Sequence, residues 1–146
     1  MSEIRHAGLL AHYGPGGWRG VLIEGPSGVG KSDLALRAIG AGLRLVADDR
    51  TLVWTSRERL FGACPPAIAG LIEARGLGLV PQSPRPFAEI QMVVRCIAPE
   101  DQLERMPEFA SQAILGLAVP ILDLHALESS SHMKLIHALS LLGGWR

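Results

Sequence analysis

The sequence has no excess of charge of either sign. Lys and Arg together number 14 and Asp and Glu together number 14, so the 146-residue chain has a formal net charge of zero. A protein without a global positive field has no long-range attraction for nucleic acid or for an anionic membrane surface. We therefore expect neither as a partner, and a charged ligand must be held by a local cluster of residues.

Cysteine is also scarce, since the chain contains just Cys64 and Cys96. Two cysteines are too few for a disulfide scaffold, and their separation matches no metal-ligand spacing. The first residues lack the apolar stretch of a signal peptide. The longest nearly apolar run, residues 113–122, is too short to span a bilayer and contains Gly116 and Pro120. These absences favour a cytoplasmic protein.

Apolar residues, in contrast, are plentiful. Hydrophobic residues make up 48% of the chain and charged residues 19%. This composition is typical of a folded globular protein, and a chain of this length is sufficient for one domain with a substantial core. We find no internal repeat and no low-complexity tract, so we expect a single domain over residues 1–146.

One stretch organises the rest of the chain. The apolar residues 21–23 lead into a Gly-x-x-x-x-Gly-Lys-Ser motif, and residues 33–38 continue at helical spacing. A strand, this loop and a helix in that order form a phosphate-binding P-loop. The predicted phosphate cradle consists of consecutive residues: Gly25, Pro26, Ser27, Gly28, Val29, Gly30, Lys31 and Ser32.

The residue types of the motif explain its chemistry. Its glycines let the backbone curl so that successive N–H groups point at one anion, and the following helix adds the positive end of its dipole. Lys31 is placed to reach the β- and γ-phosphates of a nucleotide, and the Ser32 hydroxyl is placed to ligate Mg²⁺. The sequence shows no adenine pocket, so the preferred base stays open.

Short apolar segments around the P-loop predict a mixed sheet. Strands are expected at residues 4–11, 18–24, 43–47, 51–55, 60–62 and 89–97, with one more within 113–123. Turn-forming residues join the first two strands into a hairpin. One helix is expected after Ser32, ending at Gly40 or Gly42, and a last helix is expected after the serines at 129–131. The fold class that follows is α/β, a P-loop-containing mixed sheet with few helices.

A P-loop alone binds phosphate, whereas phosphoryl transfer also needs acidic groups that hold Mg²⁺ and orient or deprotonate the acceptor. Asp48 and Asp49 end the strand that follows the P-loop helix. In a parallel strand–helix–strand unit this strand end lies at the same sheet edge as the P-loop. Two adjacent carboxylates repel each other unless a cation or proton is shared. We interpret them as site residues, with a solvated turn as the alternative.

Glu73 and Arg75 stand in a segment that is otherwise apolar or glycine. Alternate residues of a strand point to the same face, so both side chains are expected on one side. The neighbouring glycines, Gly70, Gly76 and Gly78, indicate that the backbone passes close to a ligand. A surface ion pair between the two residues is the alternative.

Three segments together resemble the catalytic domain of HPr kinase/phosphorylase: residues 25–32, Leu45-Val46-Ala47-Asp48-Asp49, and Ile72-Glu73-Ala74-Arg75-Gly76-Leu77-Gly78. Members of that family phosphorylate a serine of the phosphocarrier protein HPr, and the longer members also remove the phosphate by phosphorolysis. The resemblance implies an HPr kinase-like fold and a Mg²⁺- and ATP-dependent serine kinase in phosphotransferase-system regulation. Its partner would be an HPr-like protein.

The resemblance also assigns roles residue by residue. Catalytic roles fall to Lys31, Asp48, Asp49, His6 and Arg75, and Mg²⁺ ligation falls to Ser32, Asp49 and Glu73. One of the two aspartates would act as the base in the kinase direction and as the acid in reverse. His6 aligns with a family histidine that lies on the strand before the P-loop, near the acidic pair, whereas from the sequence alone a single histidine is more often structural.

The resemblance has limits. This chain is similar to the short bacterial form that lacks the N-terminal domain of the longer members. From Pro99 onward it shows no counterpart of the arginine-containing loop and Arg-Asn motif of the family. The phosphorylase activity and the assembly into a homo-oligomer therefore stay open.

Two other functions remain as alternatives. Compact P-loop kinases of small molecules also place an aspartate after the second strand, but the chain has no Arg-rich lid segment between two helices. A regulatory nucleotide-binding module without catalysis is the other alternative. The intact Lys31 and Ser32 and the acidic pair argue against it.

Overall fold

The computed structural model describes residues 1–66 and 69–142, so the predicted domain over 1–146 extends beyond the described residues. The strands are β1 (Ser2–Arg5), β2 (Gly8–Gly14), β3 (Gly17–Glu24), β4 (Arg44–Ala47), β5 (Thr51–Ser56), β6 (Arg59–Ala63), β7 (Leu71–Ala74), β8 (Gly78–Pro81), β9 (Ala88–Cys96), β10 (Ala110–Ile114) and β11 (Leu117–Leu124), and the helices are α1 (Lys31–Gly40) and α2 (Ser131–Leu142). In the described part of the chain, no helix has the length and apolar character needed to cross a membrane.

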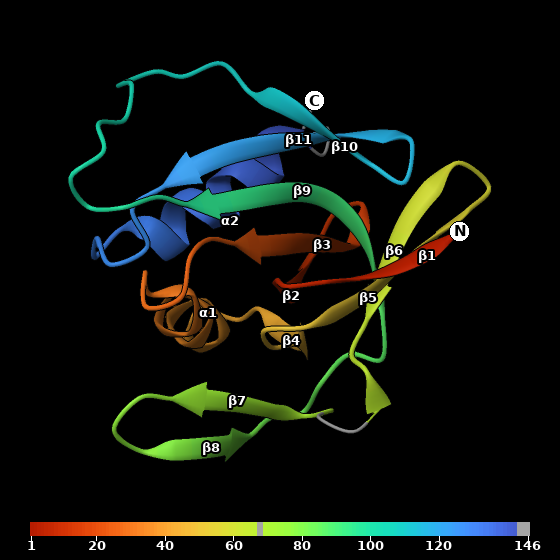
Figure 1. The fold of residues 1–146 in the computed structure, drawn as a ribbon, viewed down its shortest axis with the longest axis horizontal. Helices are drawn as coiled ribbons and strands as arrows, with labels where there is room; N and C mark the ends of the chain where they lie inside the picture. Colours follow the sequence, from red (N-terminus) through yellow and green to blue (C-terminus); the bar gives the residue numbers. More distant parts are fainter. Residues whose placement is uncertain (67–68, 143–146) are drawn as a thin grey trace.

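Most of the strands join one curled sheet. Its order in the described residues is β1-β5-β6-β9-β3-β2-β4, and the β10–β11 hairpin joins β9 through β11. Along one side β9 pairs in parallel with β3, and along the other it pairs first with β6 and then with β11. The β7–β8 hairpin stands apart, below the main sheet in Figure 1. The predicted α/β fold, a mixed sheet with few helices, is confirmed.

The β2–β3 hairpin brings the P-loop strand to the centre of this sheet. Gly14 pairs with Gly17, so the turn between them contains two residues, and Gly17 has a φ of 90° that glycine adopts without strain. β2 lies between β3 and β4 and is antiparallel to both. β3 and β4 therefore run in the same direction and end at the same edge, although they are not neighbours.

Two strand predictions were wrong in detail. The expected strand at residues 4–11 is broken at 6–7, because β1 pairs with β5 whereas β2 pairs with β3 and β4. The expected single strand within 113–123 is part of a hairpin of two strands, β10 and β11. Leu115 and Gly116 form its turn with φ values of 49° and 83°, as a two-residue hairpin turn requires.

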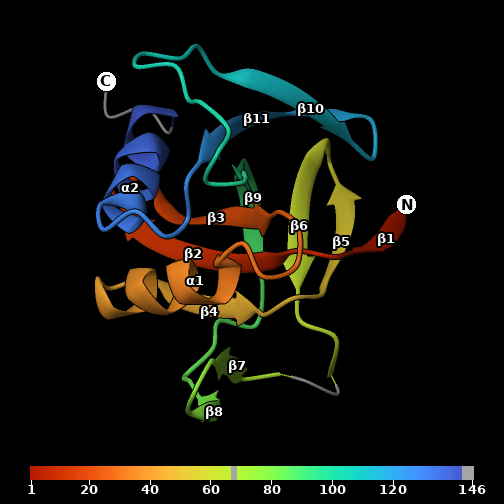
Figure 2. The same ribbon diagram turned by 60° about the vertical axis from the view of Figure 1, so that its left-hand side comes forward.

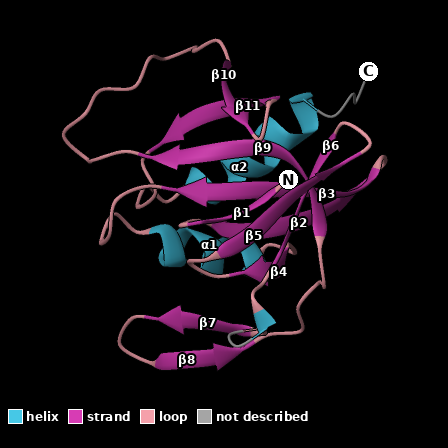
Figure 3. Ribbon diagram, turned by 45° about the vertical axis from the view of Figure 1, so that its right-hand side comes forward, coloured by secondary structure: helices cyan, strands magenta, loops and turns pink. Residues whose placement is uncertain are grey.

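The sheet has a buried core on each face. Side chains alternate along β3, so Val21 and Ile23 face the helices whereas Leu22 faces the opposite side. Figure 2 shows α1 and α2 together on the helical side, and Figure 3 shows the strands β1, β5 and β6 curling away from them. Burial on both faces fixes the central strands, and with them the positions at which β3, β4 and β9 end.

Candidate active site

A cleft of about 440 Å³ opens at the edge where β3 and β4 end. Its walls come from the loop after β3, the start of α1, the turn after β4, the end of β7 with the turn that follows it, and the segment after β11. Of the predicted site residues, the cleft brings together Ser27, Gly28, Gly30, Lys31, Ser32, Asp49, Glu73 and Arg75. Asp48 lines a smaller adjoining hollow, and His6 reaches the site through Asp49.

The phosphate loop depends on backbone conformations that its glycines allow. Gly25, Gly28 and Gly30 have φ values of 150°, 81° and 106°. Gly25 also has no room for a side chain, because a Cβ there would lie 2.7 Å from the carbonyl oxygen of Cys96 on β9. Gly30 is the N-cap residue of α1, and no side chain of the described residues caps this helix. Its first N–H groups therefore face the cleft in the manner of an anion site.

Lys31 is the first residue of α1 and is half-buried. Its ammonium group donates a hydrogen bond to the carbonyl oxygen of Gly25, at the other end of the loop. A phosphate in the loop would offer the ammonium a charged acceptor in place of this neutral one, and charge-assisted hydrogen bonds are stronger. The Lys31 ammonium is therefore held beside the loop, where it could exchange the Gly25 carbonyl for a phosphate oxygen as its hydrogen-bond acceptor.

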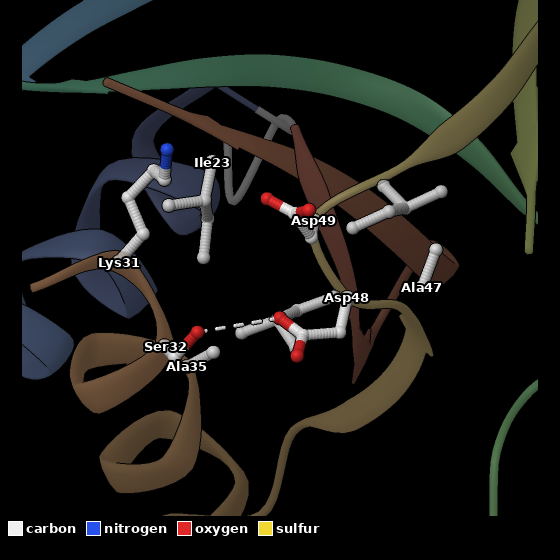
Figure 4. Close-up of a pocket in the computed structure, with 10 residues that line it drawn as sticks. Ile23, Lys31, Ser32, Ala35, Ala47, Asp48 and Asp49 are labelled. Atoms are coloured by element: carbon white, nitrogen blue, oxygen red, sulfur yellow. Dashed lines mark hydrogen bonds between the residues drawn. The ribbon is translucent and has the colours of Figure 1, made fainter. Parts of the chain in front are cut away.

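Asp48 faces the start of α1. The Ser32 hydroxyl lies 3.5 Å from Oδ1 of Asp48, and the backbone N–H of Glu73 donates to Oδ2 at 3.1 Å. Figure 4 shows Asp48 turned toward Ser32 across the smaller hollow. Burial raises the pKa of the Asp48 carboxyl, and the negative charges of Asp49 and Glu73 raise it further, against the two hydrogen bonds that lower it.

This environment suits a cation. A carboxylate that is desolvated and surrounded by other acids is stabilised when a positive ion binds beside it. The hydroxyl of Ser32 and the oxygens of Asp48 are hard donors of the kind that Mg²⁺ prefers. Within residues 1–66 and 69–142 no three His, Cys, Asp or Glu side chains form a complete metal site. Mg²⁺ in phosphoryl-transfer sites is commonly held by one or two protein oxygens together with phosphate and water.

Asp49 turns away from Asp48 and pairs with His6. The Nε2 atom of His6 lies 2.7 Å from Oδ1 of Asp49, and the two side chains are 60% and 56% exposed. The N–H of Arg50 donates to the carbonyl of Asp48 at 2.7 Å, so Asp49 is the centre of a three-residue turn with a φ of 67°. Positive φ is strained for a residue other than glycine. The turn sends the two aspartates to different sides of the site.

Glu73 and Arg75 both line the cleft, but not from one strand face as expected. β7 ends at Ala74, and Arg75 lies in the turn toward β8, which the N–H of Leu77 closes with a hydrogen bond of 2.9 Å to the Ala74 carbonyl. The strand-based reasoning was therefore wrong for Arg75, because the chain reverses there. In the described part of the chain no ion pair joins Glu73 to Arg75.

Arg37 is a structural residue that the sequence reasoning missed. Its guanidinium donates to the carbonyl oxygens of Ala126 and Glu128 and forms an ion pair of 2.9 Å with Asp33. It thus fixes to α1 the segment that carries Leu127, whose side chain lines the cleft beside the phosphate loop. The four-residue spacing of Asp33 and Arg37 was a signal for the ion pair. The contacts with residues 126–128 had no local signal.

Comparison with known proteins identifies relatives over most of the chain. The family model described as HPr Serine kinase C-terminal domain matches residues 2–141. The HPr kinase/phosphorylase of Limosilactobacillus reuteri (strain DSM 20016) is 38% identical over 112 residues, which are 69% of this chain and 35% of that protein. The HPr kinase/phosphorylase of Lacticaseibacillus casei (strain BL23) is 47% identical over 76 residues, 51% of this chain and 23% of that protein. The matches span about a quarter to a third of these relatives.

A solved structure agrees with these relatives. The structure of the Hpr(Ser) kinase/phosphatase from Coxiella burnetii superposes with a TM-score of 0.82 at 25% sequence identity. The superposition covers 97% of this chain and 99% of the other. The arrangement of strands and helices around the cleft is therefore shared along nearly the whole chain.

Proposed function

The chain belongs to the family of HPr serine kinase C-terminal domains, and we propose that it transfers the γ-phosphate of Mg²⁺-bound ATP to a serine of an HPr-like phosphocarrier protein. The observation that carries the proposal is the shared strand edge: the uncapped P-loop, Asp48 and the His6–Asp49 pair all lie where β3 and β4 end. A phosphate site and a carboxylate for the acceptor are the two parts that phosphoryl transfer requires.

The phosphate side of the site consists of the loop and α1. The loop N–H groups and Lys31 would hold the phosphates and neutralise the charge that develops during transfer. Mg²⁺, when bound, would supply positive charge that neutralises the phosphates during transfer. Ligation of Mg²⁺ by Ser32, Asp49 and Glu73 remains a prediction. Because Asp48 lies beside Ser32, we add Asp48 to the proposed Mg²⁺ ligands.

The acceptor side consists of Asp49 and His6. Of the two aspartates, Asp49 is the more exposed and is paired with an imidazole. We assign to it the removal of the proton from the acceptor hydroxyl, while His6 orients the carboxylate. A base that stands open to solvent suits an acceptor carried on another protein, because such a serine arrives on a large surface. Arg75, at the opposite wall, is available to contact the transferred phosphoryl group.

The experiment follows labelled phosphate from ATP. The chain is incubated with Mg²⁺ and labelled ATP, and with either a purified HPr-like protein or an extract of small metabolites. The proposal predicts label on a serine of the protein, and none when Lys31 is replaced in Lys31→Ala. Label on a metabolite would support a small-molecule kinase instead. ATP binding without transfer to either would support a regulatory module.

Further properties of the family are proposals at the same level. We expect the protein to act in the cytoplasm, where the HPr-like partner would be. The reverse reaction is tested in the same assay by adding inorganic phosphate to the phosphorylated partner. Release of label from the serine would add phosphorolysis to the proposed activity, and retention would restrict it to the kinase direction.

A further inference from the structure

We propose that Arg5 and Glu24 form a positioning pair that holds His6 against Asp49, an inference that rests on the proposed function. Arg5 is the last residue of β1 and directly precedes His6. Glu24 is the last residue of β3 and directly precedes the phosphate loop. The pair therefore joins the segment that carries the imidazole to the segment that carries the loop.

A single nitrogen of the Arg5 guanidinium contacts both carboxylate oxygens of Glu24. Nη2 of Arg5 lies 3.1 Å from both Oε1 and Oε2 of Glu24, and the side chains are only 18% and 22% exposed. Nε of Arg5 is buried and has no hydrogen-bond partner among the described residues. Nη1 of Arg5 also lies 3.3 Å from Oε1 of Glu3, whose side chain is more exposed than that of Glu24. A guanidinium in such surroundings depends most on the less exposed carboxylate, because neither group is well solvated without the other.

No strand pairing replaces this contact. β1 is the edge strand of the sheet and pairs with β5, not with β3. His6 lies in the two-residue link between β1 and β2, with an exposed side chain that Asp49 alone is seen to contact in the described structure. An exposed His–Asp pair contributes little by itself, so its geometry depends on how well the two backbones are fixed.

The other end of the link is fixed independently. The hydroxyl of Thr51, which is fully buried, donates to the carbonyl oxygen of Ala7 at 2.8 Å. Thr51 follows Asp49 by two residues, so this bond ties the Asp49 turn to the residue after His6. The residue before His6 is attached as well, because the backbone of Arg5 pairs with Thr51 in the β1–β5 ladder. The Arg5 side chain adds an attachment to β3 through Glu24. Removing this side chain should leave the link paired with β5 but no longer fixed to the strand that carries the phosphate loop.

Neighbouring charges keep Glu24 available to Arg5. In the pairing of β3 with β9, Glu24 lies opposite Arg95. Arg95 is itself engaged with Asp123 on β11 through contacts of 2.8 Å and 3.0 Å. Because Asp123 satisfies Arg95, the Glu24 carboxylate remains directed to Arg5, and the strand ends carry a row of alternating charges.

The kinetic test is a double-mutant cycle between Arg5→Gln and His6→Ala. If Arg5 acts through His6, Arg5→Gln should lower the single-turnover transfer rate about ten- to a hundredfold, since small misplacements of catalytic groups cost about that much. Nucleotide affinity should change less than about threefold. In the His6→Ala background the same substitution should have no further effect. Losses that add in the double variant would overturn the proposal.

Two further variants keep the test decisive. Arg5→Lys retains the charge but loses the second guanidinium nitrogen, which contacts Glu3, so it should fold and show a smaller loss of rate of the same kind. Arg59→Gln breaks the exposed Arg59–Glu89 ion pair, which lies elsewhere on the same sheet, and should leave the rate unchanged. A loss in Arg59→Gln equal to that in Arg5→Lys would contradict a specific role for Arg5.

A spectroscopic measurement separates this inference from the proposed function. The Nε2 resonance of His6 in a long-range ¹H–¹⁵N spectrum reports the imidazole environment without nucleotide or acceptor. We expect Arg5→Gln to shift this resonance toward its position in Asp49→Asn, where the pairing is weakened directly. An unshifted resonance would overturn the positioning role. If the wild-type chain phosphorylates no HPr-like protein, the proposed function fails while this spectrum still decides the role of Arg5.

Discussion

Substitution of Gly25 by alanine tests how closely the phosphate loop is held against β9. Gly25 has a φ of 150°, and a Cβ at this position would lie 2.7 Å from the carbonyl oxygen and 3.0 Å from the Cβ of Cys96. The nearest obstacle is backbone of a central buried strand, so it cannot move aside as the end of a flexible side chain would.

The cost of Gly25→Ala has two parts. A residue other than glycine in this region of φ costs about 1–3 kcal/mol, and forcing an additional methyl group into a packed site costs about another 1–3 kcal/mol. Gly28→Ala is the matched control, because Gly28 also has a positive φ of 81° but a Cβ there meets nothing within 4 Å. The difference between the two variants therefore reports the close contacts at Gly25, which are with Cys96 and, at 3.2 Å, with the Val29 side chain.

The assay is thermal unfolding of both variants without nucleotide. A chain of this size loses roughly 3 °C of Tm per kcal/mol, so Gly25→Ala should unfold about 3–9 °C below Gly28→Ala. Equal Tm values for the two variants, within about 2 °C, would refute the reasoning. They would mean that the loop is free to move away from β9 and is not held in one conformation by it.

Other predictions follow from single contacts. Lys31→Ala should abolish transfer of labelled phosphate and leave Tm nearly unchanged, because among the described residues the ammonium donates a hydrogen bond to the Gly25 carbonyl alone; residual transfer near the wild-type rate would exclude the P-loop role. Burial raises the pKa of Asp48, so its contribution to stability is present at low pH and lost as pH rises through the raised pKa. Asp48→Asn should therefore unfold at neutral pH at no lower denaturant concentration than wild type, and a clear destabilisation there would contradict this. Arg37→Met should lower the free energy of unfolding by about 1–3 kcal/mol, measured by denaturant titration, because it removes the charged hydrogen bonds to the carbonyls of Ala126 and Glu128 and leaves both carbonyls to Ser131; an unchanged midpoint would show that Ser131 and water replace the guanidinium.

The phosphate loop was predictable because everything that defines it is local. An apolar strand, glycines at fixed offsets and a helix in sequence are visible within residues 21–38. The position of Asp48 followed from the expectation that β3 and β4 run in the same direction. They do so in the structure, although β2 lies between them. Local residue types and simple chain geometry were sufficient for this part of the site.

Turns without a distinctive sequence were not predictable. The β10–β11 turn places Leu115 at a φ of 49°, a backbone conformation that leucine rarely adopts and that its presence in a sequence does not predict. Pro120 suggests the end of a strand, although it lies within β11. The reversal at Arg75 was hidden for a related reason, since the glycines after it were interpreted as ligand contacts and not as a turn. In each case tertiary pairing selects the conformation.

Contacts between distant residues were the least predictable part of the site. His6 and Asp49 are 43 residues apart, and the family resemblance, not the residue pattern, brought them together before the structure did. Arg5 and Glu24 are 19 residues apart and were not singled out at all. A charged residue at the end of a strand has many candidate partners, and the curl of the sheet decides among them.

The central claim is that the carboxylates at the end of β4 convert a phosphate site into a transfer site. Its most direct test is the single-turnover rate of phosphate transfer to the acceptor serine in Asp49→Asn, with nucleotide affinity measured on the same preparation. General-base catalysis contributes about 10²- to 10⁴-fold, so we predict a rate loss in that range with affinity within about threefold of wild type. An unchanged rate, or a loss of nucleotide affinity alone, would contradict the account.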